Sequence, residues 1–168
     1  RRQRQMCIRD SLCTMTFEEN QRTFTGVSVE CMAAVLQGLG VDAIGVNCSL
    51  GPDGLYPIVE KLVKHTNLPV IVKANAGLPD PVTNLFNVDP DEFAESSVKL
   101  AQLGVKILGG CCGTTPAHIK ALVQKLDSIK YTKSAYKAVS AVCSGTAYAE
   151  ITEPTRLRCI SYAVFCLK

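Results

Sequence analysis

The stretch Gly109-Gly110-Cys111-Cys112-Gly113-Thr114-Thr115-Pro116 carries the strongest indication of the fold of this 168-residue chain. It connects an apolar segment, residues 105–109, to an amphipathic segment that continues to Leu126. A strand that runs through a glycine-rich turn into a helix is one unit of a parallel α/β sheet. The stretch therefore predicts a βα unit with two cysteines at the carboxyl end of its strand.

Three further units of this kind precede it, at intervals of roughly 30 residues, the length of a strand with its helix. Their expected strands are residues 12–17, 43–48 and 69–75, and their expected helices are about 28–39, 52–65 and 89–103. Gly40 is expected to end the first helix, because glycine readily adopts the left-handed conformation of a C-cap. Four consecutive units leave two architectures open, a doubly wound sheet and a barrel.

The composition excludes several classes of protein. With 47% hydrophobic residues the chain can bury a core, as one domain or as part of a larger one. Its net charge of +3 forms no basic stripe, and no apolar run reaches the roughly 20 residues of a membrane span, so we expect neither a nucleic-acid nor a membrane partner. Nine unevenly spaced cysteines without a preceding signal segment favour a cytoplasmic location over a disulfide framework.

Three cysteines occupy the ends of expected strands. Cys48 ends the second strand, and Cys111 and Cys112 follow the fourth. The carboxyl ends of barrel strands meet at one rim, where three thiolates could hold zinc with one position open, the pattern of catalytic sites. Two alternatives remain open: the cysteines could be small core residues, and the glycine-rich turn before a helix could bind phosphate.

The other cysteines and the two histidines lack such a context. His65 is expected to close its helix favourably against the helix dipole. His118 is expected to be an exposed helix residue and not a metal ligand. The cysteines expected to be incidental are Cys7, Cys13, Cys31, Cys143, Cys159 and Cys166.

Four segments in a fixed order resemble the homocysteine S-methyltransferase family, and within it most closely the N-terminal domain of the cobalamin-dependent methionine synthases. They lie one at the end of each expected strand and together cover roughly residues 12–126. The segments are Cys13-Thr14-Met15-Thr16-Phe17-Glu18-Glu19 with Arg22-Thr23-Phe24-Thr25-Gly26, then Gly45-Val46-Asn47-Cys48-Ser49-Leu50-Gly51-Pro52, Ala74-Asn75-Ala76-Gly77-Leu78-Pro79, and Gly109 to Pro116.

The resemblance implies a (β/α)8 TIM-type barrel, of which this α/β chain would be the C-terminal half, strands five to eight with their helices. The expected half-barrel, a homocysteine-binding zinc domain, is residues 12–130. Residues 131–151 are similar to the linker that leaves such a barrel toward a folate domain. Residues 1–11 and 152–168 match neither pattern.

The resemblance also implies a reaction and its participants. Zn²⁺ bound by Cys48, Cys111 and Cys112 would activate homocysteine as a thiolate for methyl transfer, which gives methionine. Methylcobalamin is the implied methyl donor, carried by a domain absent from this chain, so the cobalamin and folate domains of a parent chain are expected partners. Asn75 would fill the open zinc position until the substrate displaces it, and Glu18 and Glu19 would face the substrate's amino group.

A half-barrel is physically incomplete. Parallel strands are normally covered by neighbours on both sides, so cutting a barrel leaves unpaired edges through which the chain could self-associate. We therefore expect the chain alone to be weakly active or inactive. Two other readings stay open, a zinc-binding but catalytically incomplete fragment or interaction module, and a phosphate-binding barrel enzyme.

Overall fold

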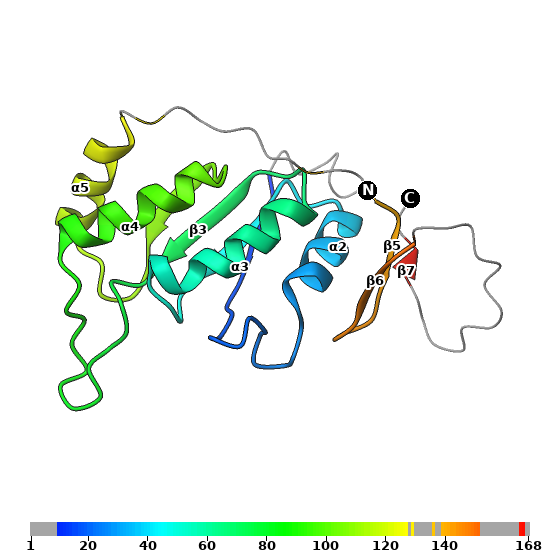
Figure 1. Cartoon of the computed structure of the whole chain (residues 1–168), viewed down its shortest axis with the longest axis horizontal. Helices are drawn as coiled ribbons and strands as arrows, with labels where there is room; N and C mark the ends of the chain where they lie inside the picture. Colours follow the sequence, from blue (N-terminus) through cyan, green and yellow to red (C-terminus); the bar gives the residue numbers. More distant parts are fainter. Residues whose placement is uncertain (1–9, 128, 130–135, 137–138, 152–164, 167–168) are drawn as a thin grey trace.

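A computed structural model describes residues 10–127, 129, 136, 139–151, 165 and 166. The main body alternates strands and helices along the chain (Figure 1). Its elements are β1 (Leu12–Met15), α2 (Val29–Leu39), β2 (Ala43–Asn47), α3 (Pro52–His65), β3 (Val70–Ala74), α4 (Pro90–Gln102), β4 (Ile107–Gly110) and α5 (Pro116–Leu126). The four expected βα units are therefore present, and each strand is one or two residues shorter than predicted.

The four strands form one parallel sheet in the order β1-β2-β3-β4. The spatial order follows the chain order without the reversal that defines a doubly wound sheet. One row of the sheet runs from Thr14 through Gly45 and Ile71 to Ile107. This topology is compatible with part of a TIM-type barrel.

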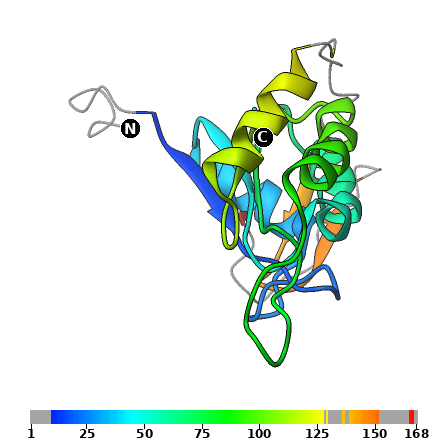
Figure 2. The same cartoon turned by 90° about the vertical axis from the view of Figure 1, so that its left-hand side faces the viewer.

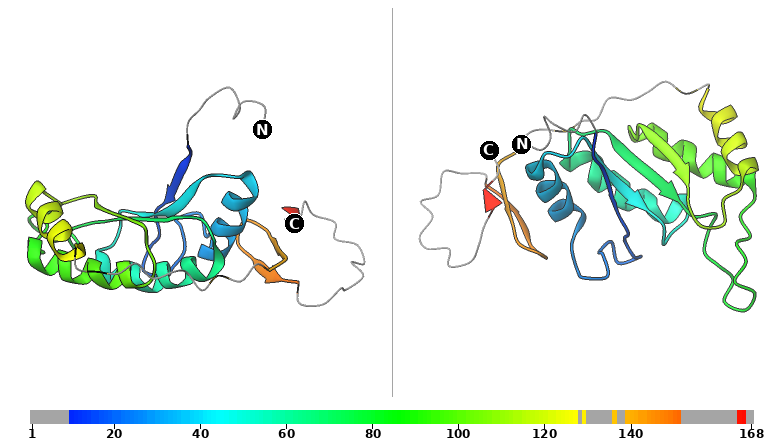
Figure 3. Two further views of the ribbon diagram at one scale, coloured as in Figure 1. Left: turned by 90° about the horizontal axis from the view of Figure 1, so that it is seen from above. Right: turned by 180° about the vertical axis from the view of Figure 1, so that it is seen from behind.

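The helices cover one side of the sheet, as the views from the front and from above show (Figures 1 and 3). Consecutive helices also contact one another, α2 with α3, α3 with α4, and α4 with α5. The core lies between this helical layer and alternate strand residues, among them Ile44, Val46 and Val72. In Figure 2, β1 lies on the opposite side of the molecule from α4, as expected for the outer strand of the sheet.

Local sequence signals set the helix ends. Gly40 adopts φ 74° and its N–H bonds carbonyls of the last turn of α2, which confirms the predicted C-cap. Asp89 caps α4 by accepting hydrogen bonds from two backbone N–H groups, and Pro90 occupies the first helical position. Every helix among the described residues is too short or too polar to form a transmembrane span.

A short antiparallel hairpin follows the main body and was not predicted. Its strands are β5 (Ala141–Cys143) and β6 (Tyr148–Glu150), and β5 also pairs with β7 (Phe165–Cys166). The hairpin packs on α2, where buried Cys143 joins Cys31 and Ala34 in a small apolar cluster. The segment expected to be a linker, residues 131–151, therefore contains folded structure attached to the main body.

Candidate metal centre

The sheet brings two of the cysteines to one edge. Cys48 directly follows β2 and Cys111 directly follows β4, and both bond to β3, the strand between them. The Cys48 N–H donates to the carbonyl of Lys73 over 2.9 Å, and the Cys111 N–H donates to the carbonyl of Ala74 over 2.7 Å. The parallel ladder thus continues into the two cysteines, which gives their backbones fixed positions.

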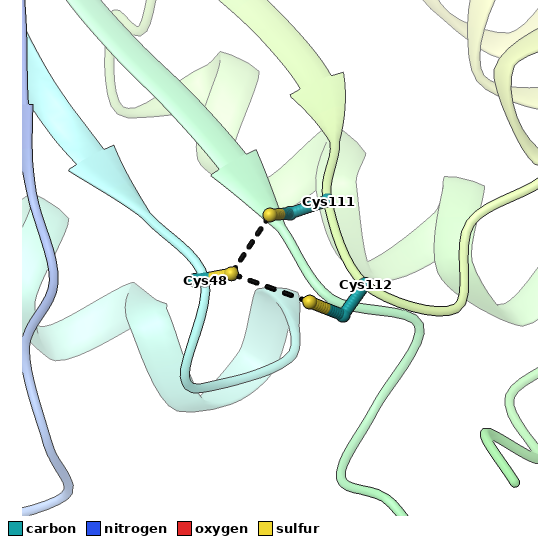
Figure 4. A group of neighbouring side chains, drawn as sticks. All are labelled: Cys48, Cys111 and Cys112. Carbon is teal, nitrogen blue, oxygen red and sulfur yellow. Dashed lines mark hydrogen bonds between the residues drawn. The ribbon is translucent and has the colours of Figure 1, made fainter.

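The three cysteine side chains point toward one another (Figure 4). The Sγ atom of Cys48 lies 2.8 Å from that of Cys111 and 3.4 Å from that of Cys112. All three Sγ atoms lie within 4.8 Å of one another, and they form the one such group of three metal-ligating side chains among the described residues. We call Cys48, Cys111 and Cys112 the cysteine cluster.

An unusual backbone conformation directs Cys48 into the cluster. Cys48 and Ser49 have φ values of 60° and 64°, in the left-handed region that residues other than glycine seldom adopt. Two hydrogen bonds hold this turn: the Leu50 N–H donates to the Cys48 carbonyl, and the Asn75 N–H donates to the Leu50 carbonyl. Each left-handed residue costs about 1–2 kcal/mol, and such strain is often retained where a functional group must be aimed.

The turn after β4 is held from two sides. The Thr114 hydroxyl donates to the Cys111 carbonyl over 2.7 Å. The Cys112 N–H donates to Oδ1 of Asn75 over 3.0 Å, and the Cys112 carbonyl accepts from the Ala76 N–H over 2.9 Å. Cys112 is therefore tied to the end of β3 through both of its backbone polar groups.

Two glycines make this turn possible. A side chain at Gly110 would collide with Thr114, the residue that binds the Cys111 carbonyl. Gly113 has φ 78°, and a Cβ there would collide with the ring of Phe86. Glycine therefore allows the cysteine pair to approach both its own helix and the loop after β3.

The thiols influence one another's protonation. The hydrogen bond that the Cys48 and Cys111 thiols share lowers the pKa of Cys48 below its usual value. The same hydrogen bond, together with burial and the neighbouring negative charge, raises the pKa of Cys111 to about 11. Three thiols at this spacing cannot all ionise without a cation between them.

The cluster fits a soft divalent cation. Thiolates bind soft or borderline-soft metals, zinc among them, and tetrahedral Zn–S bonds of about 2.3 Å put sulfur atoms about 3.8 Å apart. The separations from Cys48 to Cys111 and to Cys112 are shorter, 2.8 and 3.4 Å, so these two pairs would open by about 1 Å or less to accept the ion. Three protein ligands leave a fourth position for another group.

Asn75 lies beside the cluster. The residue is 5% exposed, and its Oδ1 accepts the Cys112 N–H. A carbonyl oxygen has two acceptor sites, so this bond leaves one of them for another partner. The described contacts assign Asn75 an orienting role for Cys112, and its expected role as an exchangeable metal ligand stays a prediction.

Glu18 and Glu19 are exposed in the turn that follows β1. The Gln21 N–H donates to the Glu18 carbonyl, and the Glu18 N–H donates to the Arg22 carbonyl, which close this turn. The turn belongs to the same edge of the sheet as the cluster, since β1 and β2 are parallel neighbours. The structure gives no contact from either carboxylate to a cluster residue, so their contact with substrate also stays a prediction.

The expectation that His118 is exposed was wrong. His118 is 6% exposed: its Nδ1 accepts from the Thr115 N–H, and its Nε2 lies 3.0 Å from the Val88 carbonyl. Its ring also meets that of Phe93 edge to face. His118 occupies the third helical position, which turns toward the loop before α4, and sequence period alone did not place that loop over it. It is not in the cluster.

Thr114 was not singled out from the sequence as a functional residue. Its hydroxyl fixes the Cys111 carbonyl, and the signal that could have found it is the threonine placed directly after the Cys-Cys-Gly turn. Among the cysteines expected to be incidental, Cys31 and Cys143 are buried away from the cluster and Cys13 is half-buried on β1. Cys7 and Cys159 lie outside the described residues.

Comparison with known proteins yields a family and relatives. The model of the homocysteine S-methyltransferase family matches residues 3–126, a region that begins inside the segment 1–11 and ends with α5. The chain is 36% identical over 119 residues to methionine synthase of Mycobacterium tuberculosis and 38% identical over 109 residues to methionine synthase of Mycobacterium leprae. These alignments cover 69% and 63% of this chain, but only 10% and 9% of the two relatives.

Proposed function

The chain belongs to the homocysteine S-methyltransferase family, and from this premise we propose that it supplies the zinc-binding, thiol-activating part of a homocysteine methyltransferase. The observation that carries the proposal is the convergence of three Sγ atoms, within 4.8 Å of one another, at the carboxyl edge of a parallel sheet. The relatives named methionine synthase support methionine as the product.

Zn²⁺ bound by Cys48, Cys111 and Cys112 would supply Lewis acidity that keeps a fourth thiol deprotonated at neutral pH. The protein's own contribution is to hold three sulfur atoms together before the ion arrives. The left-handed turn at Cys48 and the two backbone bonds of Cys112 do this. Asn75 would offer an oxygen to the open position until substrate replaces it, since a carbonyl oxygen is a weaker zinc ligand than a thiolate.

The proposed substrate is homocysteine. Its thiol proton passes to solvent, and the sulfur then forms a bond to the methyl carbon while the bond between that carbon and the donor breaks, leaving the electron pair on the donor. Methylcobalamin, carried by a domain outside this chain, is the proposed donor, because the matched relatives are methionine synthases about ten times longer than the aligned segment. Glu18 and Glu19 would face the amino group of the substrate.

We assign the four strands to the second half of the barrel, strands five to eight. Support comes from the motif order, in which the Gly-Gly-Cys-Cys turn follows the last strand of the sheet. The proposed domain limits follow from it: a half-barrel at 12–130, a post-barrel segment at 131–151, and terminal segments at 1–11 and 152–168. The cytoplasmic location and the folate-domain partner are part of the same proposal.

A zinc-binding but catalytically incomplete fragment is the second candidate function. It is favoured by the sheet, in which β1 and β4 are outer strands within the described part of the chain. Unpaired edges invite pairing with another chain or a second copy. In this case the chain would bind zinc fully and transfer methyl groups only when a complementary half-barrel is supplied.

The phosphate-binding alternative gains little support. A phosphate at a helix N-terminus needs free backbone N–H donors. At α5 the Thr115 N–H already bonds His118, and Pro116 has no N–H. Two cysteines in the preceding turn also add no positive charge.

Metal analysis of the purified chain tests the proposal. We expect about one zinc per chain, and we expect Cys48→Ser, Cys111→Ser and Cys112→Ser each to lose it, because a hydroxyl is a much poorer zinc ligand than a thiolate. Cys13→Ser is the matched control, since Cys13 is a free cysteine outside the cluster. Full zinc content in the Cys111 and Cys112 variants would reject the ligand assignment.

A further inference from the structure

Lys73 occupies an unusual place on the sheet. Its neighbours Val72 and Ala74 are buried in the core against the helices, so Lys73, between them, points from the opposite face. The right panel of Figure 3 shows the molecule from behind, where the helices lie beyond the sheet. Lys73 is the one exposed residue of β3, and its side chain carries a positive charge.

This face would be the interior of a closed barrel. Barrel interiors are filled mainly by branched apolar side chains, and a charge there needs a partner because desolvation is costly. Among the described residues, no carboxylate forms an ion pair with Lys73. Lys73 is exposed on this face, so its ammonium group is accessible to a ligand that carries a negative charge.

Lys73 lies directly below the cysteine cluster. It is aligned with Asn47 on β2 and Gly109 on β4, the last row of the sheet before the cluster. Its carbonyl accepts the Cys48 N–H over 2.9 Å. A Cβ at Gly109 would lie 3.7 Å from Cγ of Lys73, so the lysine stem extends over the space that this glycine leaves open.

We propose that Lys73 binds the carboxylate of the amino-acid thiol whose sulfur the cysteine cluster holds through its metal. This inference rests on the proposed function and adds the recognition of the substrate's acid group. An ammonium group paired with a carboxylate makes a charge-assisted hydrogen bond, and its position fixes the direction in which the short thiol extends from the open position. Lys73 would select amino-acid thiols over simple alkyl thiols.

The test compares two thiols that differ by one group. Zinc-loaded wild-type chain, Lys73→Met and Lys73→Arg are titrated calorimetrically with L-homocysteine and with 3-aminopropane-1-thiol, which is homocysteine without its carboxylate. We expect Lys73→Met to weaken homocysteine binding by up to about 5-fold, the size of an ion pair made by an exposed lysine, and to change binding of the other thiol less than about 2-fold. Lys73→Arg should restore most of the homocysteine affinity, and zinc content should not change.

Lys120→Met is the matched control, because Lys120 is an exposed lysine on α5, away from the sheet face. It should leave both affinities unchanged. Equal weakening of both thiols in Lys73→Met, or no weakening of either, would overturn the assignment of Lys73 and leave the proposed function standing. Failure of the wild-type zinc-loaded chain to bind homocysteine at all would overturn the proposed function, and the assignment with it.

Discussion

Replacing Asn75 by alanine removes the side-chain hydrogen bond that ties the backbone of Cys112 to the end of β3. Asn75 is 5% exposed, and its Oδ1 accepts the Cys112 N–H over 3.0 Å. Cys112 keeps a second bond, from the Ala76 N–H to its carbonyl, so the turn should loosen without detaching.

The expected size of the effect follows from the environment of this bond. Leaving a buried donor unsatisfied costs about 1–3 kcal/mol, and since this bond is only partly buried we expect about 1–2 kcal/mol. If the whole of this free energy is lost from zinc binding, the zinc affinity falls roughly 5- to 30-fold. The metal-free chain should also unfold at a lower urea concentration.

Two measurements check this reasoning, zinc competition against a chromophoric chelator and urea unfolding of the metal-free chain. Asn67→Ala is the matched control, because Asn67 is exposed and its side chain makes no described hydrogen bond. A zinc affinity of Asn75→Ala within about 2-fold of wild type would refute the claim that Asn75 orders Cys112 for metal binding.

Three further outcomes follow from the structure. In the metal-free chain, alkylation mapped by mass spectrometry should modify Cys48 before Cys111 at neutral pH, because the pKa of Cys48 is lowered and that of Cys111 is raised. The fold raises the pKa of Cys111 from 9.0 to about 11, so the contribution of this thiol to the free energy of unfolding is present below pH 9.0 and is lost between pH 9.0 and about 11. Urea unfolding at several pH values would detect this loss. Preferential alkylation of Cys111 would contradict this order. Asp89→Ala should lower the free energy of unfolding by about 1 kcal/mol through loss of the α4 cap, whereas Asp89→Asn, which keeps an acceptor, should lower it much less; equal losses would show that capping is not the cause. Gly113→Ala should lower the free energy of unfolding by at least about 1–2 kcal/mol, because it forces alanine into a left-handed conformation against Phe86. An unchanged midpoint of thermal unfolding would disprove that crowding.

The repeating units were readable in the chain because helix and strand periods are local properties. The switch from strand to helix after Cys48 and the cap at Gly40 involve neighbours within one or two turns, so the ends of α3 agree with the expected 52–65. The motifs also identified the family, since their residues occur in a fixed order. Strand ends were less predictable, because pairing with a neighbouring strand decides them.

The sequence missed features that depend on distant segments. The β5–β6 hairpin packs on α2 through Cys143 and Cys31, and the sequence of neither segment predicts that the two are in contact. His118 was expected at the surface because helix period does not reveal that the loop carrying Val88 covers it. Both outcomes depend on long-range packing.

By itself, the sequence determined that four βα units are present, that their strands run parallel and that three cysteines stand at strand ends. Only the tertiary structure decided that the strands follow one another in chain order, that the Sγ atoms of Cys48, Cys111 and Cys112 come within 4.8 Å of one another, and that Lys73 lies in the last row of the sheet before them. The physical reason is that residue periods act over a few neighbours, whereas strand order and register arise from hydrogen bonds between segments far apart in the chain.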